Sequence, residues 1–383
     1  MSVRRFIAGP ISGAVVLCLL PSLCGAQGLP PDEAVRGILS DRVALGRNPG
    51  IIVGLLDRGG PRVVAAGTSG REGVELDGNT VFEIGSITKV FTSAVLEDMV
   101  GRGEVRFEDP VSDLLPGHVT VPAAGGREIT LLDLATHRSG LPRMPSNFFP
   151  GDPGNPYADY TVEQLYAFLS GFELQRGIGE VWDYSNLGAG LLGHALSLKA
   201  GRTYEWLVRD RVLGPLGMEN TGIDLAPPVG APSAQGHGGT GQPVQNWDIP
   251  TFAGAGALRS TTYDMLLFAA ANLVNGGTPI STVLHRTQEV RVPNVVNNLS
   301  MALGWLVNHR FPDRPIVWHN GGTGGFHSFI GLDNAGGRAV VVLTNGTQSI
   351  DDIGFHLLDS RHPLAPPEPL PIKGTDATST LRR

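Results

Sequence analysis

Cysteine is nearly absent from this chain of 383 residues, which contains only Cys18 and Cys24. Both lie in an N-terminal segment that has the layout of a secretory signal peptide. Once that segment is removed, no cysteine is left to form a disulfide, to act as a thiol nucleophile or to bind a metal. Such a protein must be stabilised by its hydrophobic core, which a chain of this length can bury.

The N-terminal segment, residues 1–26, begins with two arginines, continues as an apolar run over residues 11–20 and ends in small residues. We expect cleavage after Ala26, and therefore a periplasmic or secreted protein. A lipoprotein is a weaker interpretation, because Leu23, which is not a small residue, precedes Cys24. The apolar run is too short to span a bilayer, and no later stretch is longer, so we expect no membrane span in the mature chain.

Long basic runs, fixed-period repeats and low-complexity segments are also absent, although the chain has 53 glycines. The formal net charge is −7, so nucleic acid is not an expected partner. The motif H-E-x-x-H is missing, which leaves little support for a metal hydrolase. The elbow motif G-x-S-x-G is missing as well, so a Ser-His-Asp triad of that type is not expected. We expect neither a metal nor an organic cofactor.

The segments that are present predict an α+β fold, broadly of the α/β class. Residues 51–56 and 62–66 read as strands, and so do 315–319, 326–332 and 338–344. Between these groups lie amphipathic or apolar helical segments with capping signals, at 86–100, after Thr130, after Thr161, at 187–200 and at 261–273. The sequence therefore predicts an antiparallel sheet built from N- and C-terminal segments, flanked by helices, with a mainly helical region inserted.

We accordingly predict a single domain over residues 27–360. Its sheet part takes about residues 30–110 and 250–360, and its helical part about residues 111–249. A proline-rich, polar tail follows over residues 361–383, where we expect loose order.

The first motif with chemical meaning is Ser86-Ile87-Thr88-Lys89, preceded by Gly85. Ser86 opens a predicted helix, where free backbone N–H groups and the helix dipole stabilise an oxyanion. Lys89 follows one turn later on the same face, and a desolvated lysine can take the serine proton. Taken alone the motif is weak, because a helix cap followed by a surface lysine would give the same letters.

The second motif is Tyr184-Ser185-Asn186, directly before an apolar helix. A tyrosine near a cationic lysine can have a depressed pKa and act as a base or proton shuttle. Asn186 can hydrogen-bond a substrate amide. A buried tyrosine followed by a helix cap is the simpler interpretation of this motif by itself.

The third motif is His319-Asn320-Gly321-Gly322 at the end of a predicted strand, within a glycine-rich segment that continues to residue 325. Glycines this dense let a ligand approach the backbone closely. A backbone N–H group there could complete an oxyanion hole with that of Ser86. No G-K-[ST] follows, so a phosphate loop is not indicated.

The order of these three motifs resembles that of the serine β-lactamase and penicillin-binding superfamily, in particular class C β-lactamases and low-molecular-weight D-alanyl-D-alanine carboxypeptidases. Further segments are similar to the family's patterns, and the resemblance extends over about residues 35–350. These segments are residues 134–141 (LATHRSGL), 215–218 (PLGM), 256–261 (GALRST) and 304–305 (GW).

The resemblance implies a role for each matching residue. Ser86 is expected to be the nucleophile, Lys89 its activating partner and Tyr184 the proton shuttle of the leaving group. Asn186 would hold the substrate's amide side chain. His319 takes the place of the family's K-T-G lysine, Gly321 keeps the strand open to substrate, and the N–H groups of Ser86 and Gly322 form the oxyanion hole. His137 lies in a stretch that is structural in the family, which predicts a core histidine.

Two residues depart from the class C pattern, namely His319 in place of a lysine and Thr88 in place of serine or alanine. A histidine is largely neutral at pH 7 and holds a substrate carboxylate less well than lysine does. The expected activity is hydrolysis of β-lactam or related amide bonds through an acyl-enzyme on Ser86, with a small-molecule or peptidoglycan-derived substrate. The alternatives are a D-alanyl-D-alanine carboxypeptidase, a carboxylesterase, and a penicillin-binding sensor that is acylated without turnover.

Overall fold

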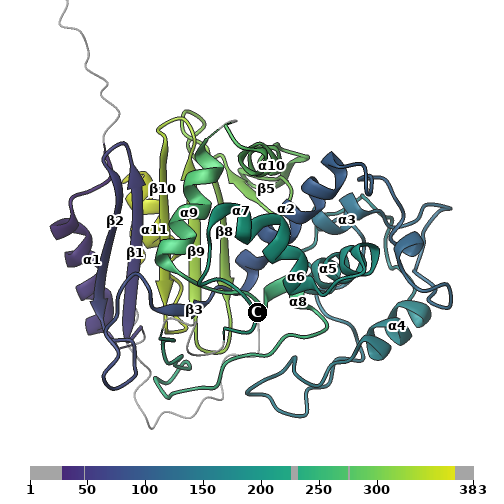
Figure 1. The fold of residues 1–383 in the computed structure, drawn as a ribbon, viewed down its shortest axis with the longest axis horizontal. Coiled ribbons are helices and arrows are strands. Elements are labelled where there is room, and N and C mark those ends of the chain that lie inside the picture. The colour runs from purple at the N-terminus through teal and green to yellow at the C-terminus, as the bar shows by residue number, and fades with distance from the viewer. Residues whose placement is uncertain (1–27, 47, 226–231, 275–276, 367–383) are drawn as a thin grey trace, which may run out of the picture.

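A central antiparallel sheet of eight strands organises the molecule, which we describe from a computed structural model for residues 28–46, 48–225, 232–274 and 277–366 (Figure 1). The predicted leader and most of the predicted tail lie outside these residues. The strand order is β2-β1-β10-β9-β8-β7-β6-β5. The strands are β1 Gly50–Asp57, β2 Gly60–Gly67, β5 Val292–Val296, β6 Leu299–Met301, β7 Leu306–Asn308, β8 Ile316–Gly322, β9 His327–Asp333 and β10 Arg338–Thr344.

The sheet joins the two ends of the chain, as the sequence predicts. Strand β1 pairs with β10, with Ile51 opposite Thr344, and β2 is the partner of β1 on its other edge. All five predicted strands are confirmed within one or two residues at their starts and within four at their ends. Strands β5, β6 and β7 were not predicted, because they are short and lack alternating hydrophobic residues.

Helices cover both faces of the sheet and form a separate region beside it, where α3, α4, α5 and α6 lie in Figure 1. Every predicted helix is present, and both predicted capping boxes close on Thr130 and Thr161. The helices that were not predicted are α1, α10, α11 and the short α6, α7 and α8. The helices are α1 Asp32–Ala44, α2 Thr88–Gly101, α3 Leu131–Ala135, α4 Val162–Gly171, α5 Asn186–Ala200, α6 Tyr204–Val208, α7 Gly214–Leu216, α8 Ala253–Gly256, α9 Thr262–Leu273, α10 Pro279–Thr287 and α11 Asp351–Leu358.

Strand alternation divides the core into two parts. Ile51 and Val53 of β1 point to one face, where they pack in a cluster with residues of α1 and α11. Ile52 points to the opposite face and joins the larger cluster that includes α2, α5 and α9. Since successive side chains of a strand point to opposite faces, a strand buried on both faces reads as the continuous apolar run seen at residues 51–56.

A second, two-stranded sheet places the segment that precedes Ser86. Strand β3 (Val81–Glu83) pairs with β4 (Arg259–Thr261), with Phe82 opposite Ser260. The next amide, that of Ile84, donates to Leu258 O at 3.1 Å. This pairing connects segments far apart in the sequence and fixes the entry to α2.

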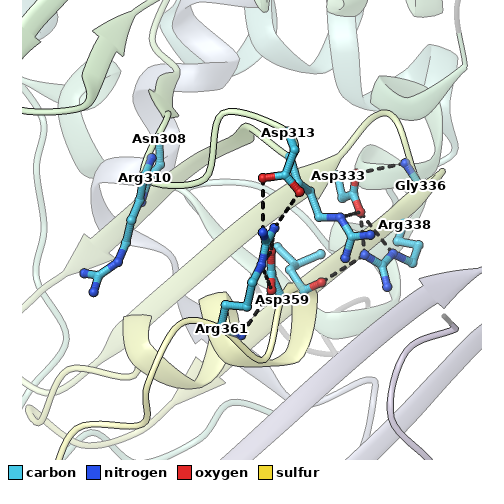
Figure 2. A network of polar contacts seen from close by, with 10 residues as sticks. Asn308, Arg310, Asp313, Asp333, Gly336, Arg338, Asp359 and Arg361 are labelled. Carbon is cyan, nitrogen blue, oxygen red and sulfur yellow. Dashed lines mark hydrogen bonds and ion pairs between the residues drawn. The ribbon is translucent and has the colours of Figure 1, made fainter. Parts of the chain in front are cut away.

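A network of arginines and aspartates ties the β9–β10 hairpin to the end of α11 (Figure 2). Asp333 is fully buried and accepts from Arg338 Nη2 at 2.5 Å and Nε at 3.1 Å. Arg338 Nη2 also donates to Leu358 O at 2.9 Å. Nearby, Arg361 bridges Asp359 and Asp313, and the Asp313 side chain is 66% exposed. The buried pair is therefore the costly one to break.

No helix in the described parts of the chain is long and apolar enough to cross a membrane.

We predict that Asp333→Asn lowers the free energy of unfolding by about 3 kcal/mol, because it removes the negative charge that balances a buried guanidinium. The matched control Asp313→Asn, made in the exposed part of the same network, should cost less than about 1 kcal/mol. Urea unfolding followed by circular dichroism measures both. Equal losses in the two variants would contradict this account.

Candidate active site

The backbone at Ser86 is shaped by close contact with the end of β8. Gly85 adopts φ +48°, and Ser86 lies in a short 3-10 helix (Gly85–Ile87) that continues as α2. A Cβ atom on Gly85 would lie 2.9 Å from Gly322 N, and one on Gly321 would lie 2.0 Å from Ile84 O. Ser328 Oγ donates to the same Ile84 carbonyl at 2.8 Å. Glycine at both positions therefore allows the approach that brings the Gly322 amide beside Ser86.

Lys89 lies one turn after Ser86 and is the polar centre of the site. Its Nζ is 2.9 Å from Ser86 Oγ, 2.9 Å from Asn186 Oδ1 and 2.7 Å from Ala255 O. The side chain is 2% exposed, and no carboxylate is among its partners. Burial lowers the pKa of Lys89 well below its usual value, and the positive charge of Arg143 lowers it further.

Lys89 Nζ donates to Ser86 Oγ, Asn186 Oδ1 and Ala255 O. In the neutral form, which burial favours, two N–H groups serve Asn186 and Ala255, and the lone pair is left for the proton of the Ser86 hydroxyl. Lys89 can therefore accept the serine proton as Oγ attacks.

Tyr184 closes the site above Lys89, whose Nζ lies 4.8 Å from the ring centroid. Burial raises the pKa of Tyr184 to about 12, and hydrogen bonding to Ser86 opposes this only in part. The expectation of a depressed pKa is therefore wrong for the free enzyme. The reason is that the phenol is buried and that Lys89, being desolvated itself, is a poor source of positive charge. Tyr184 is a proton donor at neutral pH.

Asn186 is the first residue of α5 and faces the site, but its carbonyl oxygen is taken by Lys89. Its Nδ2 donates to Tyr157 Oη at 3.5 Å, a long contact. Binding of a substrate amide by Asn186 stays a prediction.

His319 is 1% exposed and neutral. Its Nδ1 lies 2.6 Å from Asn320 O, so this nitrogen carries the proton, and Nε2 is an acceptor with no hydrogen-bond partner among the described residues. Burial lowers the pKa of His319 to about 3. The strand is held from behind, where Asn320 Nδ2 donates to Asp351 Oδ2 at 2.6 Å.

His137 is a buried core residue, as the sequence predicts. Its Nδ1 accepts from Ser185 N at 3.2 Å, and its ring lies 4.6 Å from that of Tyr184. His137 thus supports the Tyr184 ring from the side of the core.

An open cavity of about 460 Å³ contains Ser86, Tyr184, Asn186, His319, Gly321 and Gly322 in its wall. Sequence reasoning did not single out six more residues that line it, namely Arg143, Tyr157, Trp182, Trp247, Leu306 and His327. Arg143 and Tyr157 belong to the loop 142–160, whose letters gave no chemical motif. Trp247 and His327 come from other segments, and only the fold brings them here.

The family model described as Beta-lactamase matches residues 35–357 of this sequence. The chain belongs to the β-lactamase family. D-alanyl-D-alanine-carboxypeptidase/endopeptidase AmpH of Escherichia coli is 30% identical over 272 residues, which is 66% of this chain and 68% of the relative. Penicillin-binding protein 4 of Amycolatopsis lactamdurans is 27% identical over 361 residues, covering 88% and 93% of the two chains.

The solved structures agree on the fold. A class C β-lactamase from Rhodobacter sphaeroides aligns with a TM-score of 0.73 at 24% identity, over 86% of this chain and 99% of that one. The predicted resemblance and fold class are confirmed. The β-lactamase family is one of serine hydrolases, and the role of Ser86 as the nucleophile stays a prediction.

We predict that Lys89→Arg slows labelling of Ser86 by a fluorophosphonate about 1,000-fold, because arginine stays protonated and cannot act as a base. In the wild type the labelling rate should rise with pH as Lys89 loses its proton. Because the pKa of Lys89 is lowered, this rise should be complete well below pH 10.5. Mass spectrometry at a series of pH values measures the rate. Lys199→Arg, on the exposed side of α5, is the control and should label as the wild type does, whereas a Lys89→Arg profile that still recovers with pH would refute the base role.

We further predict that Gly321→Ala slows the same labelling at least 100-fold, because the new methyl group must push β8 away from Ile84 O. Gly117→Ala is the matched control, since a Cβ there meets nothing within 4 Å. Melting temperatures should accompany the rates. Normal labelling in Gly321→Ala would mean that the strand end does not position the Gly322 amide.

Proposed function

We propose that the protein hydrolyses β-lactams or D-alanyl peptides through an acyl-enzyme on Ser86. The observation that carries this proposal is the placement of Lys89 Nζ at 2.9 Å from Ser86 Oγ in a site without a carboxylate partner. A serine beside a neutral lysine is an activated nucleophile for strained or ordinary acyl groups. The names of the relatives, which include β-lactamases and a D-alanyl-D-alanine carboxypeptidase, support the same substrate classes.

The chemistry follows from the positions of three side chains. Lys89 Nζ takes the Ser86 proton while Oγ bonds to the substrate carbonyl carbon, and the amides of Ser86 and Gly322 stabilise the oxyanion. The C–N bond then breaks, and the Tyr184 hydroxyl gives its proton to the leaving nitrogen. Lys89 returns a proton to Tyr184, and water hydrolyses the ester, which restores Ser86.

A D-alanyl-D-alanine carboxypeptidase is the second candidate, and the relative of that name, which is 30% identical over 272 residues, favours it. His319 leaves both anionic substrate classes without the usual lysine. The usual lysine at this place is replaced by a buried neutral imidazole. A carboxylesterase fits the same site if the substrate carries no anion. For location, we propose export to the periplasm or beyond, on the basis of the leader layout in residues 1–26.

The mature protein should hydrolyse nitrocefin or release D-alanine from an acyl-D-alanyl-D-alanine peptide, and Ser86→Ala should reduce either rate by more than 1,000-fold. Ser40→Ala, an exposed serine of α1, is the matched control and should keep full activity. Intact-mass measurement after penicillin treatment reports the acyl-enzyme.

The outcomes separate the candidates. Nitrocefin turnover that depends on Ser86 identifies a β-lactamase, and D-alanine release without it identifies a carboxypeptidase. A stable penicillin adduct without turnover identifies a sensor. Neither turnover nor an adduct on Ser86 would refute the acyl-enzyme proposal for these substrates.

A further inference from the structure

The site has no cation at the place where the family resemblance expects one. His319 is neutral, and because its Nδ1 donates to Asn320 O, the nitrogen left over is an acceptor. An acceptor lone pair repels a carboxylate. A β-lactam or a D-alanyl peptide nevertheless carries a carboxylate, so this charge needs a different partner.

Arg143 lines the same cavity as Ser86 and Tyr184. The backbone of Arg143 is held against the start of α5, because the Arg143 carbonyl accepts from Asn186 N at 3.0 Å and from Leu187 N at 3.1 Å. Its guanidinium carbon lies 5.1 Å from the centroid of the Tyr184 ring. The cationic group is therefore held over the tyrosine beside the nucleophile.

No carboxylate in the described parts of the chain lies within ion-pair distance of Arg143, although the side chain is exposed. The acids that adjoin residues of the cavity wall have other partners. Asp183, the nearest in sequence to the second motif, is paired with Arg176. Glu83 accepts from Trp247 N at 2.8 Å, and Asp351 from Asn320.

The other ionisable side chains in the cavity wall are not cations near neutral pH. Burial lowers the pKa of His327 as it does that of His319. Lys89 just behind the wall is likewise disfavoured as a cation. Within the described residues, the permanent positive charge that faces this cavity belongs to Arg143.

We propose that Arg143 is the residue that binds the substrate carboxylate, in place of the lysine that His319 replaces. This inference rests on the proposed function, since it names the chemical group that distinguishes the substrates of the same site. A guanidinium can bind a carboxylate through two parallel N–H···O bonds, which gives direction as well as charge. The group that selects anionic acyl donors is therefore Arg143 at the rim of the cavity, and not a residue of β8.

The test compares two pairs of substrates with and without the charge. Nitrocefin, which carries a carboxylate, is set against p-nitrophenyl acetate, which is neutral. An acyl-D-alanyl-D-alanine peptide is set against its C-terminal amide. In Arg143→Gln, kcat/KM for the carboxylate substrates should fall about 10- to 100-fold more than for the neutral ones, mainly through KM, as expected for loss of one charge-assisted contact. Arg143→Lys should recover part of this difference, because it keeps the charge but not the planar fork.

Arg202→Gln is the matched control, since Arg202 also lies over an aromatic ring, 4.9 Å from that of Trp206, but on another part of the surface. It should not change the ratio between charged and neutral substrates. Removal of the Arg143 charge should also raise the pKa of Lys89. This change affects charged and neutral substrates alike, because both depend on Lys89 as the base, so the ratio of their rates is free of it.

Each outcome decides the question. A selective loss on carboxylate substrates that weakens at high salt supports the inference. Equal losses on charged and neutral substrates would assign Arg143 to the packing of Tyr184, and no loss would remove it from the site. If the wild type hydrolyses only neutral esters, the inference about Arg143 is overturned, but the proposed role of Ser86 as the nucleophile is not. Activity that is absent, or that survives Ser86→Ala, would overturn the proposed function itself.

Discussion

The buried amine of Lys89 is the constraint on which the rest of the site depends. An ammonium group taken out of water without a carboxylate is very unfavourable, so the fold favours the neutral form and with it a base beside Ser86. Each contact of Nζ comes from a different element, namely Ser86 in the 3-10 helix before α2, Asn186 at the start of α5 and Ala255 in α8. The helical region must therefore pack correctly on α2 before the serine is activated, which couples stability to chemistry.

A second constraint is steric and depends on glycine residues, which have no side chain. Strand β8 approaches the backbone before Ser86 so closely that Gly321 and Gly85 leave no room for a Cβ atom. The same strand is tied on its far side to α11 through Asn320 and Asp351. Ser86, the amide of Gly322 and the wall of the cavity are thus held by one strand end, through close backbone packing and the side-chain hydrogen bonds of Asn320 and Ser328.

Much of this could be predicted from the sequence, and the exceptions have physical causes. The strands at residues 51–56 and 338–344 are continuous apolar runs, and Thr130 and Thr161 carry local capping signals, so these elements are visible without tertiary information. Helix α11 and strands β5 to β7 are short, and their hydrophobic pattern depends on a neighbouring surface. A depressed pKa of Tyr184 requires a cationic lysine beside it, whereas burial raises the pKa of Tyr184 and lowers that of Lys89.

The sequence by itself determined the order of the chemical motifs, the pairing of Ser86 with Lys89 one turn apart and the presence of glycine where β8 must approach. These are local properties, because helix periodicity and the absence of a side chain act over a few residues. Only the tertiary structure decided the protonation states of Lys89, Tyr184 and His319, which depend on burial by distant segments. It also placed Arg143 over the Tyr184 ring, since the contact of residue 143 with the start of α5 joins parts of the chain that no local pattern relates.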